Sequence, residues 1–119
     1  MDETQNLIKA VTEGIQEKKG KRIIIADLTE IGDTICKYFI ICQGNSPSQT
    51  GAITDSIIEH VRKKTQLRPV SVDGQKNAEW VAIDYFDIVV HVFLPETRDF
   101  YNLEHLWADA QLTEIPDID

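Results

Sequence analysis

Apolar residues in the first half of the chain switch between the spacing of a helix and that of a strand. Between residues 3 and 18 they recur along one helical face, which predicts a single amphipathic helix. The segments 22–28 and 37–44 are instead apolar runs rich in isoleucine, and each predicts a buried strand. The chain is therefore expected to begin as a helix followed by two strands.

A helix start follows the second strand in the segment "NSPSQ". Ser46 stands directly before Pro47, and Gln49 follows three residues after the serine. A serine before a helix can accept a hydrogen bond from a free backbone N–H of the first turn, and proline fits the first helical position because it has no N–H. The pattern predicts a capping box and a helix that extends to about residue 64.

Strand-like patterns dominate the second half of the chain. Residues 67–74 predict a short strand, and residues 79–94 predict a β-hairpin. Residues 96–110 predict a helix or a pair of short helical turns. The remaining segment, "QLTEIPDID", is predicted to be loose, so that one domain covers residues 1–112 and residues 113–119 form a tail.

The order of these elements, α-β-β-α-β-β-β-α, indicates an α/β (α+β) domain built on a single mixed β-sheet. The helix in the middle of the chain requires a crossover connection, so some strands are expected to pair in parallel. With so few helices, one face of the sheet is expected to be poorly covered and open to a partner.

The predicted hairpin has two faces of different character. A two-residue loop at residues 85–86 would place aliphatic side chains on one face, which must then be core. The other face would carry aromatic and acidic side chains, with Asp84 directly opposite Asp87. In the same register Trp80 lies opposite His91. Like charges on neighbouring strands repel each other, and a cation from a binding partner would relieve that repulsion.

Each of these residues also has an ordinary structural interpretation. The two aspartates are equally consistent with plain turn residues. His91 can be a hydrogen-bonded core residue, and Trp80 can simply cap the core. Phe86 fits poorly in a two-residue loop, because the favoured turns need a positive φ there. A longer loop would shift the register and exchange the two faces.

The net charge of −8 indicates which partners suit this surface. General repulsion from phosphate argues against direct nucleic-acid binding, and a basic protein partner fits better, although acidity alone also serves solubility. No segment reaches the roughly 20 apolar residues of a membrane span, and the acidic N-terminus is unlike a signal peptide. A cytoplasmic protein without membrane association is therefore expected.

An enzymatic function has weak support in the sequence. The strand-to-helix turn at residues 44–46 could bind a phosphate through its backbone amides. A nucleotidyltransferase would also need acidic metal ligands, and no Asp-x-Asp stands on a predicted strand. We therefore predict no catalytic residue, metal or cofactor. A plain homodimerisation module is the other alternative, since it would use the same aromatic face.

Two long segments resemble a known family. They are "KYFIICQGNSPSQTGAITDSI" and "WVAIDYFDIVVHVFLPETRDFYNLEHLWADA". With them, the chain from about residue 23 to residue 110 is similar to the ribosomal silencing factors, also called Iojap-related proteins. The resemblance implies a nucleotidyltransferase-like fold and binding to the large ribosomal subunit through its fourteenth ribosomal protein. It further implies a steric block to joining of the small subunit when nutrients are short, and the ability to form homodimers.

The family pattern also points to the residues that contact the ribosomal protein, where aromatic side chains supply buried area and carboxylates pair with basic groups. The expected contacts on the hairpin are Trp80, Asp84, Tyr85, Asp87 and His91, with Tyr101 and Glu104 at the rim and Trp107 as the anchor of the last helix. Two positions depart from the pattern. Cys36-Lys37 replaces a Thr-Asp pair, which removes an acidic group, and Phe86 replaces the hairpin glycine, which alters the turn.

Overall fold

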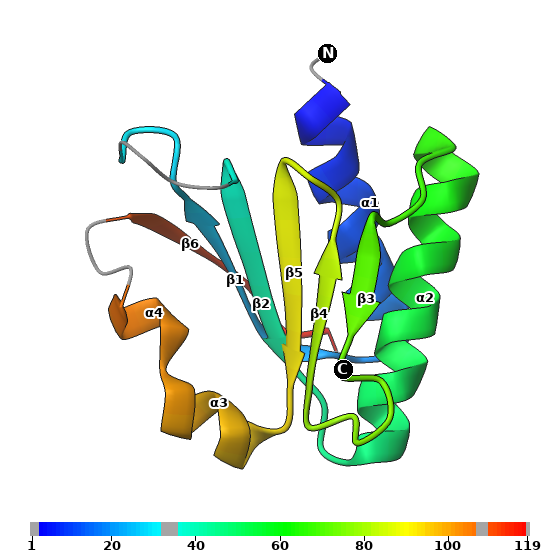
Figure 1. Cartoon of the computed structure of the whole chain (residues 1–119), viewed down its shortest axis with the longest axis vertical. Coiled ribbons are helices and arrows are strands. Elements are labelled where there is room, and N and C mark those ends of the chain that lie inside the picture. Colours follow the sequence, from blue (N-terminus) through cyan, green and yellow to red (C-terminus); the bar gives the residue numbers. More distant parts are fainter. Residues whose placement is uncertain (1–2, 32–35, 107–109, 119) are drawn as a thin grey trace.

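Six strands form one mixed sheet in the computed structural model, which describes residues 3–31, 36–106 and 110–118. The strands are β1 (Lys21–Asp27), β2 (Tyr38–Gln43), β3 (Ser71–Asp73), β4 (Trp80–Asp84), β5 (Ile88–Phe93) and β6 (Gln111–Ile115). Their order across the sheet is β3-β4-β5-β2-β1-β6 (Figure 1). β2 and β5 pair in parallel and the other neighbours are antiparallel. The predicted mixed sheet with a parallel pair is confirmed.

Helices cover the two faces of this sheet unequally. The long helices α1 (Glu3–Glu17) and α2 (Pro47–Thr65) pack together on one face, and the main core lies between them and the sheet. The short helices α3 (Pro95–Tyr101) and α4 (Leu103–Leu106) lie on the other side (Figure 1). A smaller cluster that includes Phe39, Ile41 and Phe93 packs there against Leu103. The more sparsely covered face is thus the one that α3 and α4 border.

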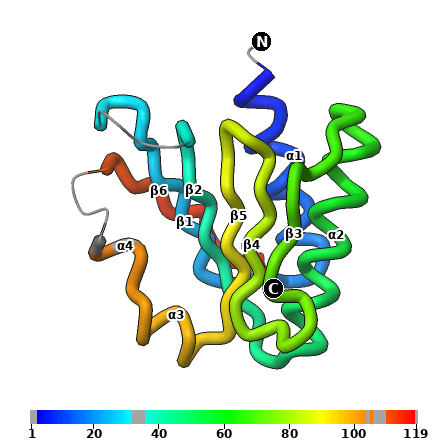
Figure 2. Tube along the Cα trace, viewed as in Figure 1, coloured from blue at the N-terminus to red at the C-terminus, as the bar shows by residue number. Residues whose placement is uncertain are grey.

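The C-terminal segment contains a strand, so the prediction of a loose tail is wrong for residues 111–115. β6 pairs with β1 along its whole length, and Figure 2 shows this last strand, in red, beside β1. Beyond it the Asp117 carboxylate accepts a 2.8 Å hydrogen bond from the Arg22 backbone N–H. Most side chains of β6 are exposed, so backbone pairing holds this strand. The sequence of such a strand does not alternate between apolar and polar residues, which is the pattern that predicts a half-buried strand.

The hairpin turn is longer than the predicted two-residue loop, and Asp84 pairs with Val89 instead of Asp87. The Asp84 carboxylate accepts a 2.7 Å hydrogen bond from the Phe86 N–H, which is a common role of aspartate in turns. The predicted repulsion between two opposed aspartates therefore does not arise. The interpretation of Asp84 as a turn residue is confirmed.

The longer turn moves the strand register by two residues, and each residue keeps its predicted face because side chains alternate with a period of two. Trp80 lies opposite Phe93, and His91 lies opposite Ala82. Val81 faces the main core, whereas Trp80 packs on the smaller cluster. The division of the hairpin into two different faces is confirmed, while the predicted pairing of Trp80 with His91 across the strands is wrong.

Phe86 adopts a left-handed backbone conformation in this turn, with a φ of 76°, and the residue is 76% exposed. This conformation costs a residue with a Cβ atom about 1 kcal/mol relative to glycine. We therefore expect Phe86→Gly to raise the free energy of unfolding by about 1 kcal/mol in urea titrations. Phe86→Ala, which removes the ring but keeps the Cβ, is the matched control and should show little of this gain. An unchanged or lowered stability of the glycine variant would mean that the ring makes stabilising contacts.

Candidate partner-binding surface

An aromatic cluster lies where β4 begins and α3 ends. The Trp80 ring stacks on Phe93 with centroids 5.0 Å apart, and its centroid lies 4.6 Å from that of Tyr101. Tyr101 in turn meets Phe100 edge to face at 5.0 Å. Exposure rises outward through the cluster: Phe93 is buried, Trp80 is half-buried, and Phe100 is 80% exposed. Contiguous apolar surface of this kind often marks a binding site.

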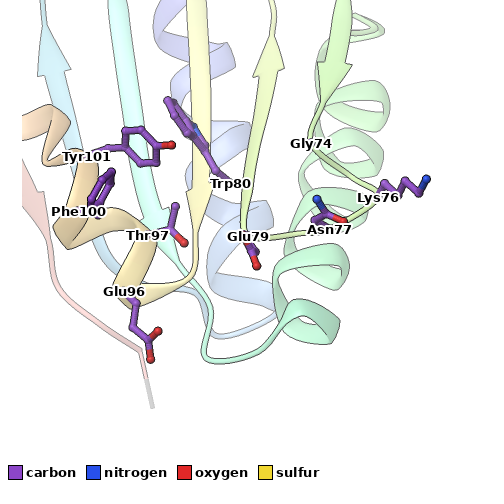
Figure 3. Close-up of a pocket in the computed structure, with 9 residues that line it drawn as sticks. All are labelled: Gly74, Lys76, Asn77, Glu79, Trp80, Glu96, Thr97, Phe100 and Tyr101. Carbon is purple, nitrogen blue, oxygen red and sulfur yellow. The ribbon is translucent and has the colours of Figure 1, made fainter.

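This cluster forms one wall of a groove of about 450 Å³ between α3 and the loop that joins β3 to β4 (Figure 3). We call it the aromatic groove, and its lining residues are Gly74, Lys76, Asn77, Glu79, Trp80, Glu96, Thr97, Phe100 and Tyr101. The carboxylates of Glu79 and Glu96 are exposed at its edge, and the Lys76 side chain extends away from the rings (Figure 3). Aromatic faces and carboxylates both attract cations, so the groove suits basic side chains.

A buried arginine holds α3 against the sheet. Arg98 is 1% exposed, and its Nη1 donates a 2.7 Å hydrogen bond to the Arg22 carbonyl and a 3.3 Å bond to the Gln43 side-chain oxygen. These bonds connect α3 to β1 and to the end of β2. Sequence analysis missed Arg98, since an arginine in a short polar helix gives no sign of burial. Because Tyr101 lies one helical turn later, Arg98 helps to set where the aromatic wall stands.

His91 lies beneath the cluster and not on the surface, so the prediction that it is displayed for contact is wrong. The residue is 7% exposed, and its ring meets Phe39 edge to face at 4.9 Å. Its Nδ1 accepts a 3.0 Å hydrogen bond from the Trp80 Nε1–H, diagonally across the two strands. Burial lowers the pKa of the imidazole to about 4. The ring is therefore neutral near neutral pH, and the interpretation of His91 as a hydrogen-bonded core residue is confirmed.

Tyr85 also lies away from the predicted contact face. It is 6% exposed and belongs to the main core on the side of α1 and α2. Burial raises the pKa of its hydroxyl to about 12, so the side chain is neutral. A partner could not reach the ring in this conformation, and the prediction that Tyr85 is a contact residue is not supported by its position.

The remaining predicted residues do not join the groove. Asp84 is four residues from Trp80 along β4, or about 13 Å, and Asp87 lies in the turn beyond it. Both aspartates are partly exposed and stay accessible at that end of the hairpin. Glu104 belongs to α4, but its side chain and all of Trp107 lie outside the described residues. Of the predicted contacts, the structure brings together Trp80, His91 and Tyr101.

The turn at residues 44–46 is a poor phosphate cradle, because two of its backbone amides already have partners. The Gly44 N–H donates to the Phe93 carbonyl at 2.9 Å, and the Asn45 N–H donates to the Gln49 side-chain oxygen at 2.7 Å. Ser46 caps α2 by accepting a 3.1 Å bond from the Gln49 N–H, which confirms the serine cap. The reciprocal bond of the predicted capping box differs, since the Gln49 side chain accepts from Asn45 and not from Ser46. The helix start therefore explains the feature that suggested nucleotide binding.

Over residues 3–31, 36–106 and 110–118, no group of three or more His, Cys, Asp or Glu side chains could hold a metal ion. No helix in the same part of the chain is both long and apolar enough to cross a bilayer. The exposed aromatic wall makes the aromatic groove the candidate functional surface.

Comparison with known proteins gives the chain a family context. All of residues 1–119 match the profile of the family described as ribosomal silencing factor during starvation. A protein from Halalkalibacterium halodurans named Ribosomal silencing factor RsfS is 34% identical over 111 residues, covering 93% of each chain. A mouse protein named Mitochondrial assembly of ribosomal large subunit protein 1 is 33% identical over 84 residues, which are 66% of this chain and 37% of that protein. A crystal structure of a Chromobacterium violaceum protein has a TM-score of 0.84 and 33% identity, covering 90% of this chain and 88% of that one.

Proposed function

Because the chain belongs to the ribosomal silencing factor family, whose members are regulatory proteins and not enzymes, we propose that it binds the large ribosomal subunit through the aromatic groove and keeps the small subunit from joining. The contacted component is the fourteenth ribosomal protein of that subunit. The complex forms in the cytoplasm and lowers translation when nutrients are short.

The observation that carries this proposal is the exposed aromatic wall of the groove. Protein interfaces are enriched in tyrosine, tryptophan and phenylalanine, and a few such side chains contribute most of the binding energy. Phe100 and Tyr101 are 80% and 46% exposed, and the half-buried Trp80 lies behind them. Together they offer a preformed apolar surface whose side chains are already held by mutual contacts.

Charge supports a basic partner. The chain carries a net charge of −8, and Glu79 and Glu96 are both exposed on the groove. Proteins that lie against ribosomal RNA need cationic surfaces to balance phosphate. Carboxylates around an aromatic patch would speed encounter with such a protein and orient it, while the rings provide the buried area.

The inhibition that we propose requires bulk and position, with no chemical step. The molecule measures 35 × 33 × 27 Å along its principal axes. A rigid body of this thickness on the joining surface of the large subunit would hold the two subunits apart where it binds. An interface of standard size, burying about 800 Å² on each partner, would be enough to keep it there.

We expect Tyr101→Ala to lower affinity for purified large subunits by about tenfold or more, because the ring is an exposed member of the aromatic wall. Pelleting of the protein with subunits through a sucrose cushion measures this. Leu67→Ala is the matched control: Leu67 is 45% exposed but lies beyond α2, near the start of α1, and its loss should leave binding unchanged.

Two results would count against the proposal. Equal pelleting of wild type, Tyr101→Ala and Leu67→Ala would show that the groove does not contact the subunit. If Tyr101→Ala instead changed a dimer to a monomer in sedimentation equilibrium while still pelleting with the subunit, the groove would be a surface for self-association.

A further inference from the structure

We propose that His91 is a positioning residue for partner binding: it never touches the partner, and its Nδ1 fixes the orientation of the Trp80 indole in the aromatic groove. This inference rests on the proposed function for its effect on affinity. The arrangement of the two side chains can be measured independently of any partner.

The hydrogen bond between the two rings defines the state of the histidine. Because the Trp80 Nε1–H is the donor at 3.0 Å, the His91 Nδ1 must carry a lone pair, and the single proton of the neutral ring lies on Nε2. Burial keeps the pKa of the imidazole at about 4, so the acceptor is present throughout the neutral range. Protonation of Nδ1 would remove it.

The other ring nitrogen shows that this histidine is not simply filling space. His91 Nε2 is buried, and it has no hydrogen-bond partner in the part of the chain that the structure describes. An unpaired buried N–H is unfavourable, and a phenylalanine would fill a similar volume without that cost. The group that distinguishes histidine from phenylalanine here is Nδ1, and Nδ1 is bonded to Trp80.

The geometry of Trp80 makes this bond relevant to the surface. One indole contact is the buried Phe93 and another is the exposed Tyr101, at 5.0 Å and 4.6 Å. Neither contact fixes which edge of the indole faces inward, because a half-turn about its Cβ–Cγ bond keeps the plane of the ring and exchanges the two edges. The bond from Nε1 to a buried acceptor does fix it. The indole therefore presents one defined edge to the groove. Because this side chain is ordered before binding, the complex does not lose the free energy of ordering it.

Three variants test this role. His91→Phe removes the acceptor and keeps a ring, His91→Asn offers a side-chain oxygen near the position of Nδ1, and Trp80→Phe removes the donor. In ¹⁵N-labelled protein, the Trp80 indole N–H signal, assigned by its loss in Trp80→Phe, should exchange slowly with solvent in wild type and in His91→Asn. It should exchange faster in His91→Phe.

Binding to purified large subunits gives the second readout. We expect His91→Phe to weaken binding about five- to tenfold, the value of one hydrogen bond to a preordered side chain. His91→Asn should restore affinity to within about twofold of wild type. In the Trp80→Phe background, His91→Phe should have no further effect, because the bond is already absent.

Each other outcome overturns the inference. An equal loss from His91→Phe in both backgrounds would mean that His91 acts without Trp80. Unchanged affinity despite faster indole exchange would mean that indole orientation does not matter for binding.

If the His91→Phe protein did not fold, the other two variants decide the question. Trp80→Phe must then weaken binding to the subunit and His91→Asn must keep it, and the positioning role is rejected if either variant behaves otherwise. If wild type itself did not bind subunits, the proposed function and the binding role would both fall, while the exchange data would still show whether His91 holds the indole.

Discussion

Replacement of Arg98 by alanine is expected to lower the free energy of unfolding by about 3 kcal/mol or more. The change removes a side chain that is 1% exposed and leaves a cavity between α3 and the sheet. It also strips the Arg22 carbonyl and the Gln43 side-chain oxygen of the bonds that Nη1 donates to them at 2.7 Å and 3.3 Å. Urea unfolding followed by circular dichroism measures the loss.

Two comparisons separate this effect from a general loss of positive charge. Arg62→Ala removes an exposed arginine of α2 and should change stability by no more than about 0.5 kcal/mol. Arg98→Lys keeps the charge but lacks the planar fork, so it should fall between wild type and Arg98→Ala. Because Arg98 anchors the helix that carries Tyr101, both Arg98 variants should also bind the ribosomal subunit more weakly. A stable Arg98→Ala with normal binding would show that α3 is held by other contacts.

Acidification from pH 7 to pH 5 is expected to remove about 2 kcal/mol of folding free energy through His91 alone. Burial lowers the pKa of this imidazole from 6.5 to about 4 in the folded protein. In the window between these values the unfolded chain binds a proton that the folded protein does not. This contribution is therefore fully present above about pH 6.5 and is lost as the pH falls toward 4, by about 1.4 kcal/mol per pH unit.

Other groups titrate in the same range, so the measurement is a difference between two proteins. His91→Phe cannot take up this proton, and its stability should fall less steeply with acid than that of wild type. Urea midpoints recorded from pH 7 to pH 5 give both profiles. Parallel profiles would contradict a neutral, buried His91 in the folded state.

The elements that sequence reasoning predicted well depend on local interactions. Ser46 and Gln49 are three residues apart, and the bond between them needs only the start of α2 to form. The two faces of the hairpin also emerged, even though the turn length was wrong. An error of two residues in register leaves every side chain on its own face, whereas an error of one would have exchanged them.

The features that could not be predicted depend on contacts between distant segments. Arg98 bonds to residues 76 and 55 positions away, so its burial follows from the packing of α3 against β1 and β2. The same holds for β6, whose exposed side chains carry no pattern and whose partner is the edge of the sheet. His91 and Tyr85 look like surface residues of a hairpin until the cluster around Phe39 and the main core are in place.

The measurement that tests the proposed function most directly is the joining of purified ribosomal subunits, followed by light scattering after mixing in the presence of this protein. Preincubation of the large subunit with wild type should reduce the amount of joined ribosome in proportion to the factor bound, and Tyr101→Ala should lose most of this effect at the same concentration. If wild type bound the large subunit and joining proceeded at its normal rate and extent, the steric block would be wrong, and the aromatic groove would serve a different purpose on the ribosome.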